Sequence, residues 1–161
     1  MSAILKLNIV GTGMFVVSAT ASAVFFTPYL RATGVFVSLV LFTVGVASFI
    51  WGYFTAAQRS RYDDISVASL YLLLGHVCSA KIRRLMNGSL IVQGLCGLAT
   101  ALARTSTNGR AGSTLAFGVL VPLFGLGLNG LWSSRHGSFS PRDNSKSLTP
   151  NPAIGKDGVH G

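Results

Sequence analysis

The sequence predicts an all-α fold: a four-helix transmembrane bundle with a cytoplasmic interfacial helix and a disordered C-terminal tail. Half of the 161 residues are apolar and only 11% are charged, whereas soluble domains carry about 25% charged residues. The apolar residues gather into runs long enough to cross the ~30 Å hydrocarbon core of a bilayer. The thirteen Lys and Arg lie in the breaks between these runs, as is usual for charges that flank membrane spans.

The first predicted span runs from residue 7 to residue 29. Lys6, the apolar stretch that follows and the small residues 21–23 resemble the three parts of a signal peptide. However, the apolar residues 24–26 continue the run past the supposed cleavage site, and the whole run is too long for a signal-peptide core. We therefore expect an uncleaved span.

Three further spans follow, at residues 35–54, 85–103 and 114–132. Together the four spans define a transmembrane domain over residues 1–132. Residues 133–161 are rich in Ser, Pro, Asn and Gly and too polar to build a core, so we expect a disordered cytoplasmic tail.

Residues 65–80 could form a fifth span, but as a helix they would cover only about 24 Å. The basic residues favour four spans, because four spans place ten of them on one side and three on the other. The ten are Lys6, Arg59, Arg61, Lys81, Arg83, Arg84, Arg135, Arg142, Lys146 and Lys156, and the three are Arg31, Arg104 and Arg110. Five spans would leave a much weaker bias. The richer side is then cytoplasmic and holds both termini, and residues 65–80 become an interfacial helix that Asp63 and Asp64 cap.

The predicted spans hold no Asp, Glu, Lys, Arg or His, which argues against a proton relay or a voltage sensor. His76, His136 and His160 have no motif around them that would complete a catalytic or metal site. Cys78 and Cys96 form no CxxC motif. We expect no enzymatic activity, no cofactor, no metal and no nucleic-acid partner.

Small and polar residues share one face of the fourth span: Gly118, Pro122, Gly125 and Asn129. Pro122 removes the hydrogen bond to the carbonyl of Gly118, so we expect a kink there. The face either packs against another helix of the bundle or lines a small cavity, and we favour packing. Similar stripes of small residues occur in the first and third spans.

Five basic residues form a rim on the predicted cytoplasmic face: Arg59, Arg61, Lys81, Arg83 and Arg84. Such clusters attract anionic lipid headgroups at about 1 kcal/mol per cation. The rim is therefore a candidate anionic-lipid contact, although the topology itself accounts for most of these charges.

Two stretches carry a resemblance: Arg61-Tyr62-Asp63-Asp64-Ile65-Ser66-Val67-Ala68-Ser69-Leu70-Tyr71, and residues 115–132 followed by Arg135-His136-Gly137. They resemble small, uncharacterised four-span integral membrane proteins of actinobacteria. The resemblance implies a four-span topology and a bacterial plasma-membrane location, and it transfers no functional residue.

These observations together favour a non-enzymatic integral membrane protein that is an accessory or scaffolding component of a membrane assembly, or a homo-oligomer. The alternative is a small transporter or lipid-handling protein with a cavity beside Pro122. A third hypothesis is a membrane tether regulated by phosphorylation of the tail near Ser140-Pro141 or Thr149-Pro150.

Overall fold

The computed structural model describes residues 2–107, 110–111 and 114–141. Its helices are α1 (Ala3–Phe25), α2 (Pro28–Arg59), α3 (Val67–Leu72), α4 (Ala80–Ala103), the 3₁₀ helix η1 (Thr114–Leu120) and α5 (Pro122–His136). The short strands β1 (Ser106–Thr107) and β2 (Arg110–Ala111) pair antiparallel between α4 and η1. Four helical segments are long and apolar enough to cross a membrane, namely α1, α2, α4 and the continuous stretch Thr114–His136. The predicted four-span, all-α architecture is confirmed to this extent.

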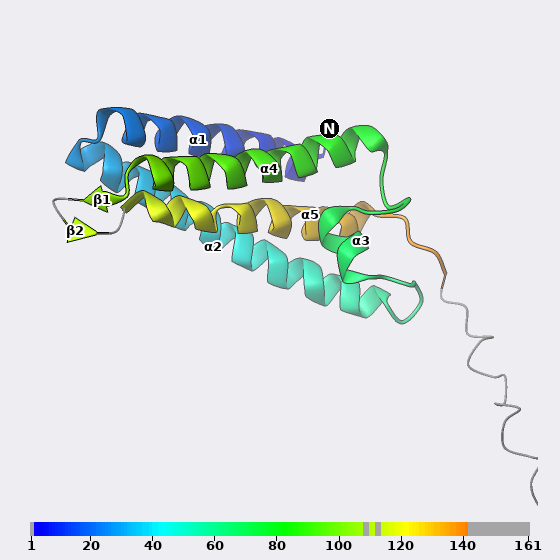
Figure 1. Cartoon of the computed structure of the whole chain (residues 1–161). Helices are drawn as coiled ribbons and strands as arrows, with labels where there is room; N and C mark the ends of the chain where they lie inside the picture. The colour runs from blue at the N-terminus through cyan, green and yellow to red at the C-terminus, as the bar shows by residue number, and fades with distance from the viewer. Residues whose placement is uncertain (1, 108–109, 112–113, 142–161) are drawn as a thin grey trace, which may run out of the picture.

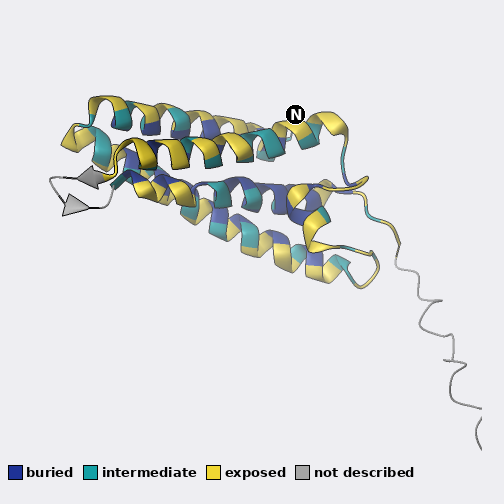
Figure 2. Cartoon of the chain, viewed as in Figure 1, coloured by how far each residue is buried: buried dark blue, intermediate teal, exposed yellow. Residues whose placement is uncertain are grey.

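α5 occupies the centre of the bundle. It contacts α1, α2, α3 and α4, with α1 and α4 on one side and α2 on the other (Figure 1). In the most apolar part of Thr114–His136, half of the residues are buried, whereas the corresponding share in the other three candidate spans is 22–33%. The outward faces of those three helices remain exposed (Figure 2). The N-terminus, α3 and the end of α5 lie at the same end of the bundle.

α2 extends beyond the predicted span at both ends. Pro28 stands in its first turn, and the hydroxyl of Thr27 accepts a hydrogen bond from the backbone N–H of Leu30 at 3.4 Å. Both features favour a helix start, so residues 31–34, which lie between the first two predicted spans, are helical. The 32 residues of α2 span about 48 Å, because the helix continues past the apolar run into polar residues.

The interfacial helix predicted over residues 65–80 is much shorter in the structure. Only Val67–Leu72 is helical, and Ser66, rather than Asp63 or Asp64, caps it by accepting a hydrogen bond from the N–H of Ser69. Leu73 follows in a left-handed conformation, with φ 51°. A left-handed residue directly after a helix ends it. Lys81, Arg83 and Arg84 consequently belong to the start of α4.

The predicted boundary between the bundle and the tail at residue 133 is also wrong. α5 continues to His136, and the next residues run along the bundle, where the N–H of Ser138 donates to the carbonyl of Val77 at 3.1 Å. Asp63 and Pro141 form an isolated antiparallel bridge. The rest of the predicted disordered tail, residues 142–161, lies outside the described residues.

Glycine lets α2 and α5 approach until their backbones touch. A Cβ atom built on Gly45 would lie 2.6 Å from Cα of Phe124, and one on Gly52 would lie 2.8 Å from the carbonyl carbon of Gly130. A Cβ on Gly127 of α5 would meet the carbonyl of Gly45. The buried residues of α2 recur every three or four positions: Gly34, Ser38, Leu41, Gly45, Ser48, Gly52 and Ala56. Small residues at this spacing allow close helix packing within a membrane.

Replacing Gly45 with Ala should destabilise the bundle by about 2 kcal/mol, because the new methyl group would collide with the backbone of α5. The loss of stability would be measured by unfolding the purified protein in detergent micelles that contain increasing amounts of a denaturing detergent. Gly13→Ala is the matched control, since no atom lies within 4 Å of a Cβ at that position. The control should be neutral or mildly stabilising. Equal stability of the two variants would contradict this packing.

Candidate functional site

The face of the fourth span predicted from sequence packs against α4. A Cβ built on Gly118 would lie 3.4 Å from Cα of Gly97, and one built on Gly125 would lie 2.7 Å from Oε1 of Gln93. Pro122 approaches the neighbouring position Gly94, whose built Cβ would lie 3.8 Å from its Cγ atom. The face therefore serves helix packing within the chain.

Pro122 marks a change of helix type. The 3₁₀ helix η1 precedes it and α5 begins at it, with Pro122 in the first turn. The carbonyl of Gly118 accepts a hydrogen bond from the N–H of Val121 at 3.2 Å. This i to i+3 bond satisfies the carbonyl that the proline leaves without its usual donor.

One cavity touches this face, at Gly118, and it is very small. It has a volume of about 10 Å³, and its lining includes Phe15, Ser38, Thr100 and Gly118. Such a volume holds about one water molecule. It is too small for the substrate of a transporter or for a lipid chain.

A buried polar cluster joins α1, α4 and α5 in the interior of the bundle. Nε2 of Gln93 donates to Oγ1 of Thr12 at 2.7 Å and to Oδ1 of Asn8 at 3.4 Å, while Oε1 of Gln93 accepts from the N–H of Gly125 at 3.2 Å. Asn8 and Gln93 are fully buried. Nδ2 of Asn8 has no hydrogen-bond partner among the described residues. Because amides in an apolar setting seek partners, the cluster sets how these three helices are rotated.

Asn129, which the sequence suggested as part of a cavity, instead anchors α3. Its Nδ2 atom donates to the carbonyl of Tyr71 at 3.0 Å and to Oδ1 of Asn87 at 3.0 Å. Nδ2 of Asn87 donates to the carbonyl of Leu72 at 2.8 Å, and the hydroxyl of Ser133 donates to that of Leu70. Three successive carbonyls at the end of α3 therefore receive side-chain donors from α4 and α5. A helix end has no backbone donors for these groups.

The side chain of Tyr71 fixes α3 against α2. Its ring stacks on Phe49 with a centroid separation of 4.2 Å, and its hydroxyl donates to the carbonyl of Phe49 at 3.1 Å. A Cβ on Gly130 would collide with this ring. Burial, together with the nearby Tyr53, raises the pKa of Tyr71 to about 12. The phenol therefore stays protonated and keeps its donor role at physiological pH.

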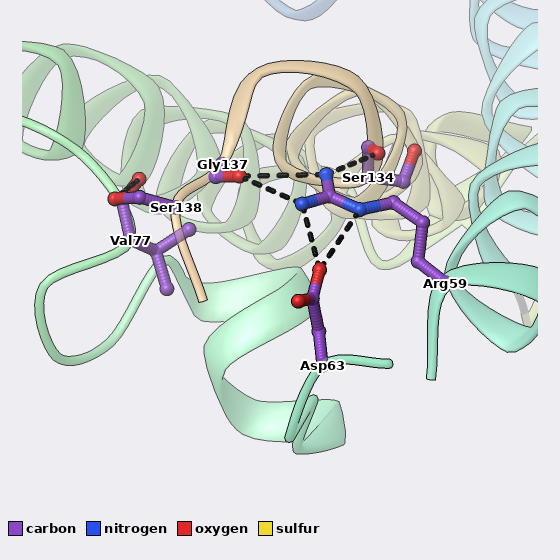
Figure 3. Close-up of polar contacts among 6 residues, drawn as sticks. All are labelled: Arg59, Asp63, Val77, Ser134, Gly137 and Ser138. Atoms are coloured by element: carbon purple, nitrogen blue, oxygen red, sulfur yellow. Dashed lines mark hydrogen bonds and ion pairs between the residues drawn. The ribbon is translucent and has the colours of Figure 1, made fainter. Parts of the chain in front are cut away.

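Arg59, one of the five candidate lipid contacts, is engaged within the chain (Figure 3). Its Nη1 atom donates to the carbonyl of Ser134 at 3.0 Å and to that of Gly137 at 3.4 Å, at the end of α5. Its Nη2 atom lies 2.9 Å from Oδ2 of Asp63. Cations at a helix C-terminus stabilise its carbonyls, so Arg59 connects the end of α2 to the end of α5.

The other four rim residues lie at the same end of the bundle. Arg61, Lys81 and Arg84 are exposed, whereas Arg83 is half-buried and donates to the carbonyl of Gly75 at 3.2 Å. Sequence reasoning identified the rim but missed the capping role of Arg59, because its partners lie 75 and 78 positions away.

Within the described residues, no group of three His, Cys, Asp or Glu residues is placed to hold a metal ion. No family model, curated protein or solved structure matches this chain.

Replacing Asn129 with Leu should release the end of α3, since the carbonyl of Tyr71 and Oδ1 of Asn87 lose a buried donor. We expect a loss of about 1–3 kcal/mol in stability and faster hydrogen exchange at residues 70–75. Thr43→Val is the control, because Thr43 is exposed and donates only along its own helix to the carbonyl of Leu39. Unchanged exchange in the Asn129 variant would refute the anchoring role.

Proposed function

We propose that this chain is a non-enzymatic integral membrane protein that serves as an accessory or scaffolding component of a membrane assembly. We place it in a bacterial plasma membrane with both termini in the cytoplasm. One observation carries the proposal: the polar groups inside the bundle are used to hold helices and α3 together. Asn8, Thr12 and Gln93 join three helices, and Asn129 anchors α3. Any partner therefore binds to the outward faces of the helices.

Those outward faces include sites where a partner helix can approach closely. Gly13 of α1 and Gly88 of α4 have no atom within 4 Å of a built Cβ. At Gly45 and Gly127, by contrast, the space that a Cβ would occupy is taken by the backbone of another helix of the same chain. Glycines on a lipid-facing surface allow tight contact with a neighbouring membrane helix.

The charge distribution supports the proposed orientation. Lys6, Arg59, Lys81 and Arg84 belong to the end of the bundle that holds α3 and the N-terminus. Arg31 and Arg104 lie at the opposite end, where α1 meets α2 and α4 ends. By the positive-inside rule the richer end faces the cytoplasm. Its exposed cations, Arg61, Lys81 and Arg84, are then available for anionic headgroups or a partner.

The alternative of a transporter or lipid-handling protein with a cavity beside Pro122 has less support. The cavity that touches Gly118 has a volume of about 10 Å³, and Gly118, Gly125 and Asn129 all face residues of α4 or α3.

Cysteine labelling tests the orientation. With Cys78 and Cys96 replaced, a membrane-impermeant maleimide should label Thr107→Cys in intact cells and should label Ser60→Cys only after the cells are opened. Thr107 lies between α4 and η1, and Ser60 directly follows α2. The reverse pattern would invert the proposed topology.

Crosslinking in native membranes tests the scaffolding role. Wild-type protein should give a defined crosslinked species, either with itself or with another membrane protein. The double variant Gly13→Leu/Gly88→Leu should lose that species without loss of monomer stability, because neither glycine is packed inside the bundle. Val17→Leu is the control, since Val17 is exposed on α1 and already carries a branched side chain. Strictly monomeric wild-type protein with no crosslinked species would overturn the proposal.

A further inference from the structure

The outward faces of α1 and α4 lie on one side of α5 and stay exposed (Figure 2). The two helices begin at the same end of the bundle and run side by side, and Gln93 of α4 joins them by donating to Oγ1 of Thr12 at 2.7 Å. Val10 and Val17 of α1 and Leu95 of α4 are 58%, 70% and 65% exposed. A helix of another molecule can therefore reach this side of the bundle.

Each of the two outward faces carries a lysine at the end nearest α3. Lys6 lies on α1 seven positions before Gly13, and Lys81 lies on α4 seven positions before Gly88. Seven residues make almost two helical turns, so each lysine shares a face with its glycine. No atom lies within 4 Å of a Cβ built on either glycine. Both lysines therefore belong to faces that point away from the other helices.

These lysines are not engaged within the part of the chain that the structure describes. Lys6 and Lys81 are exposed and form no ion pair or side-chain hydrogen bond there, and the same holds for Arg84, three positions after Lys81. Arg59 and Arg83 at the same end of the bundle, by contrast, donate to carbonyl groups of their own chain. The exposed cations of α1 and α4 thus give this side of the bundle a positive charge beside its apolar surface.

A second copy of this chain is poorly suited to this surface. A symmetric dimer places the same patch of both copies face to face, so the lysines of one copy would meet those of the other. Like charges placed together across an interface cost several kcal/mol. The chain has no Glu, and of its Asp residues Asp63 is bound by Arg59, Asp64 lies between α2 and α3, and Asp143 and Asp157 fall outside the described residues. Charge complementarity therefore points to a different protein.

We propose that the outward side of α1 and α4 docks a helix of a different membrane protein, and that this helix carries Asp or Glu at the membrane boundary beside Lys6 and Lys81. The inference rests on the proposed scaffolding role and names the chemistry of the partner. Carboxylates at that height pair with the lysines, while the apolar part of the partner helix packs over Val10 and Gly13. Opposite charges select this partner and like charges reject others. An anionic lipid would also neutralise the lysines, but only a helix backbone profits from the close approach that an exposed glycine allows.

Site-directed photocrosslinking in native membranes tests the proposal. With Cys78 and Cys96 replaced, Val10→Cys carries a benzophenone maleimide on the exposed face of α1. In cells that express two differently tagged copies of the full chain, we expect an adduct with one other membrane protein and no adduct that contains both tags. Lys6→Gln/Lys81→Gln should lower the adduct yield about fivefold, the loss expected for two exposed ion pairs. Lys6→Arg/Lys81→Arg should keep the wild-type yield.

Two controls separate this pairing from a general effect of charge. Arg61→Gln removes an exposed cation that lies between α2 and α3, and it should leave the yield at position 10 unchanged. Lys6→Glu/Lys81→Glu should abolish the adduct, and replacing the boundary carboxylates of the identified protein with Lys should restore it.

The outcomes distinguish this proposal from the scaffolding role. An adduct that contains both tags, or full yield in Lys6→Gln/Lys81→Gln, would overturn the acidic partner and leave the scaffolding role standing. Lipid adducts alone at position 10, together with a protein species in general crosslinking, would overturn this docking face only. The absence of any crosslinked protein by either method would contradict the scaffolding role itself.

Discussion

The backbone contact between α2 and α5 is the constraint on which the rest of the structure depends. In a bilayer, helices gain no hydrophobic energy by meeting one another, since the lipid is as apolar as their side chains. Association must come from close packing, and Gly45, Gly52 and Gly127 supply it by removing the Cβ atoms that would keep the two helices apart. With α2 in place, α5 is central, and α1, α4 and α3 pack around it.

Polar groups then determine how the surrounding elements are placed. Gln93 connects α4 to α1 through Thr12 and to α5 through the N–H of Gly125. At one end of the bundle, Asn129, Asn87 and Ser133 hold the carbonyls of α3, and Arg59 holds those of α5. Each bond is worth about 1 kcal/mol, so together they orient the elements more than they stabilise them. These bonds engage the buried side chains of Thr12, Gln93 and Asn129 within the chain, which is why we assign function to the surfaces.

The two ends of the bundle use arginine differently. Arg59 is bound to Asp63 and to carbonyl groups, so its charge is largely neutralised within the chain. Arg31 and Arg104 lie over the ring of Phe26, where α1 meets α2, and Nε of Arg104 donates to the carbonyl of Ala23. The sequence located all three residues at membrane boundaries but could not distinguish these roles.

The sequence by itself determined the number of spans, their order and the charge difference between the two ends, because hydropathy and charge act through the immediate surroundings of each residue. It also identified the face that contains Gly118, Pro122, Gly125 and Asn129. Only the tertiary structure decided that this face packs on α4, that α3 ends at Leu72 and that residues 137–141 run along the bundle. Those outcomes depend on partners far away in the chain, such as Asn129 for Tyr71 and Arg59 for Ser134. Stripes of small residues were evident from the sequence in the first, third and fourth spans, but the glycines of α2 that touch α5, Gly45 and Gly52, became evident only in the structure.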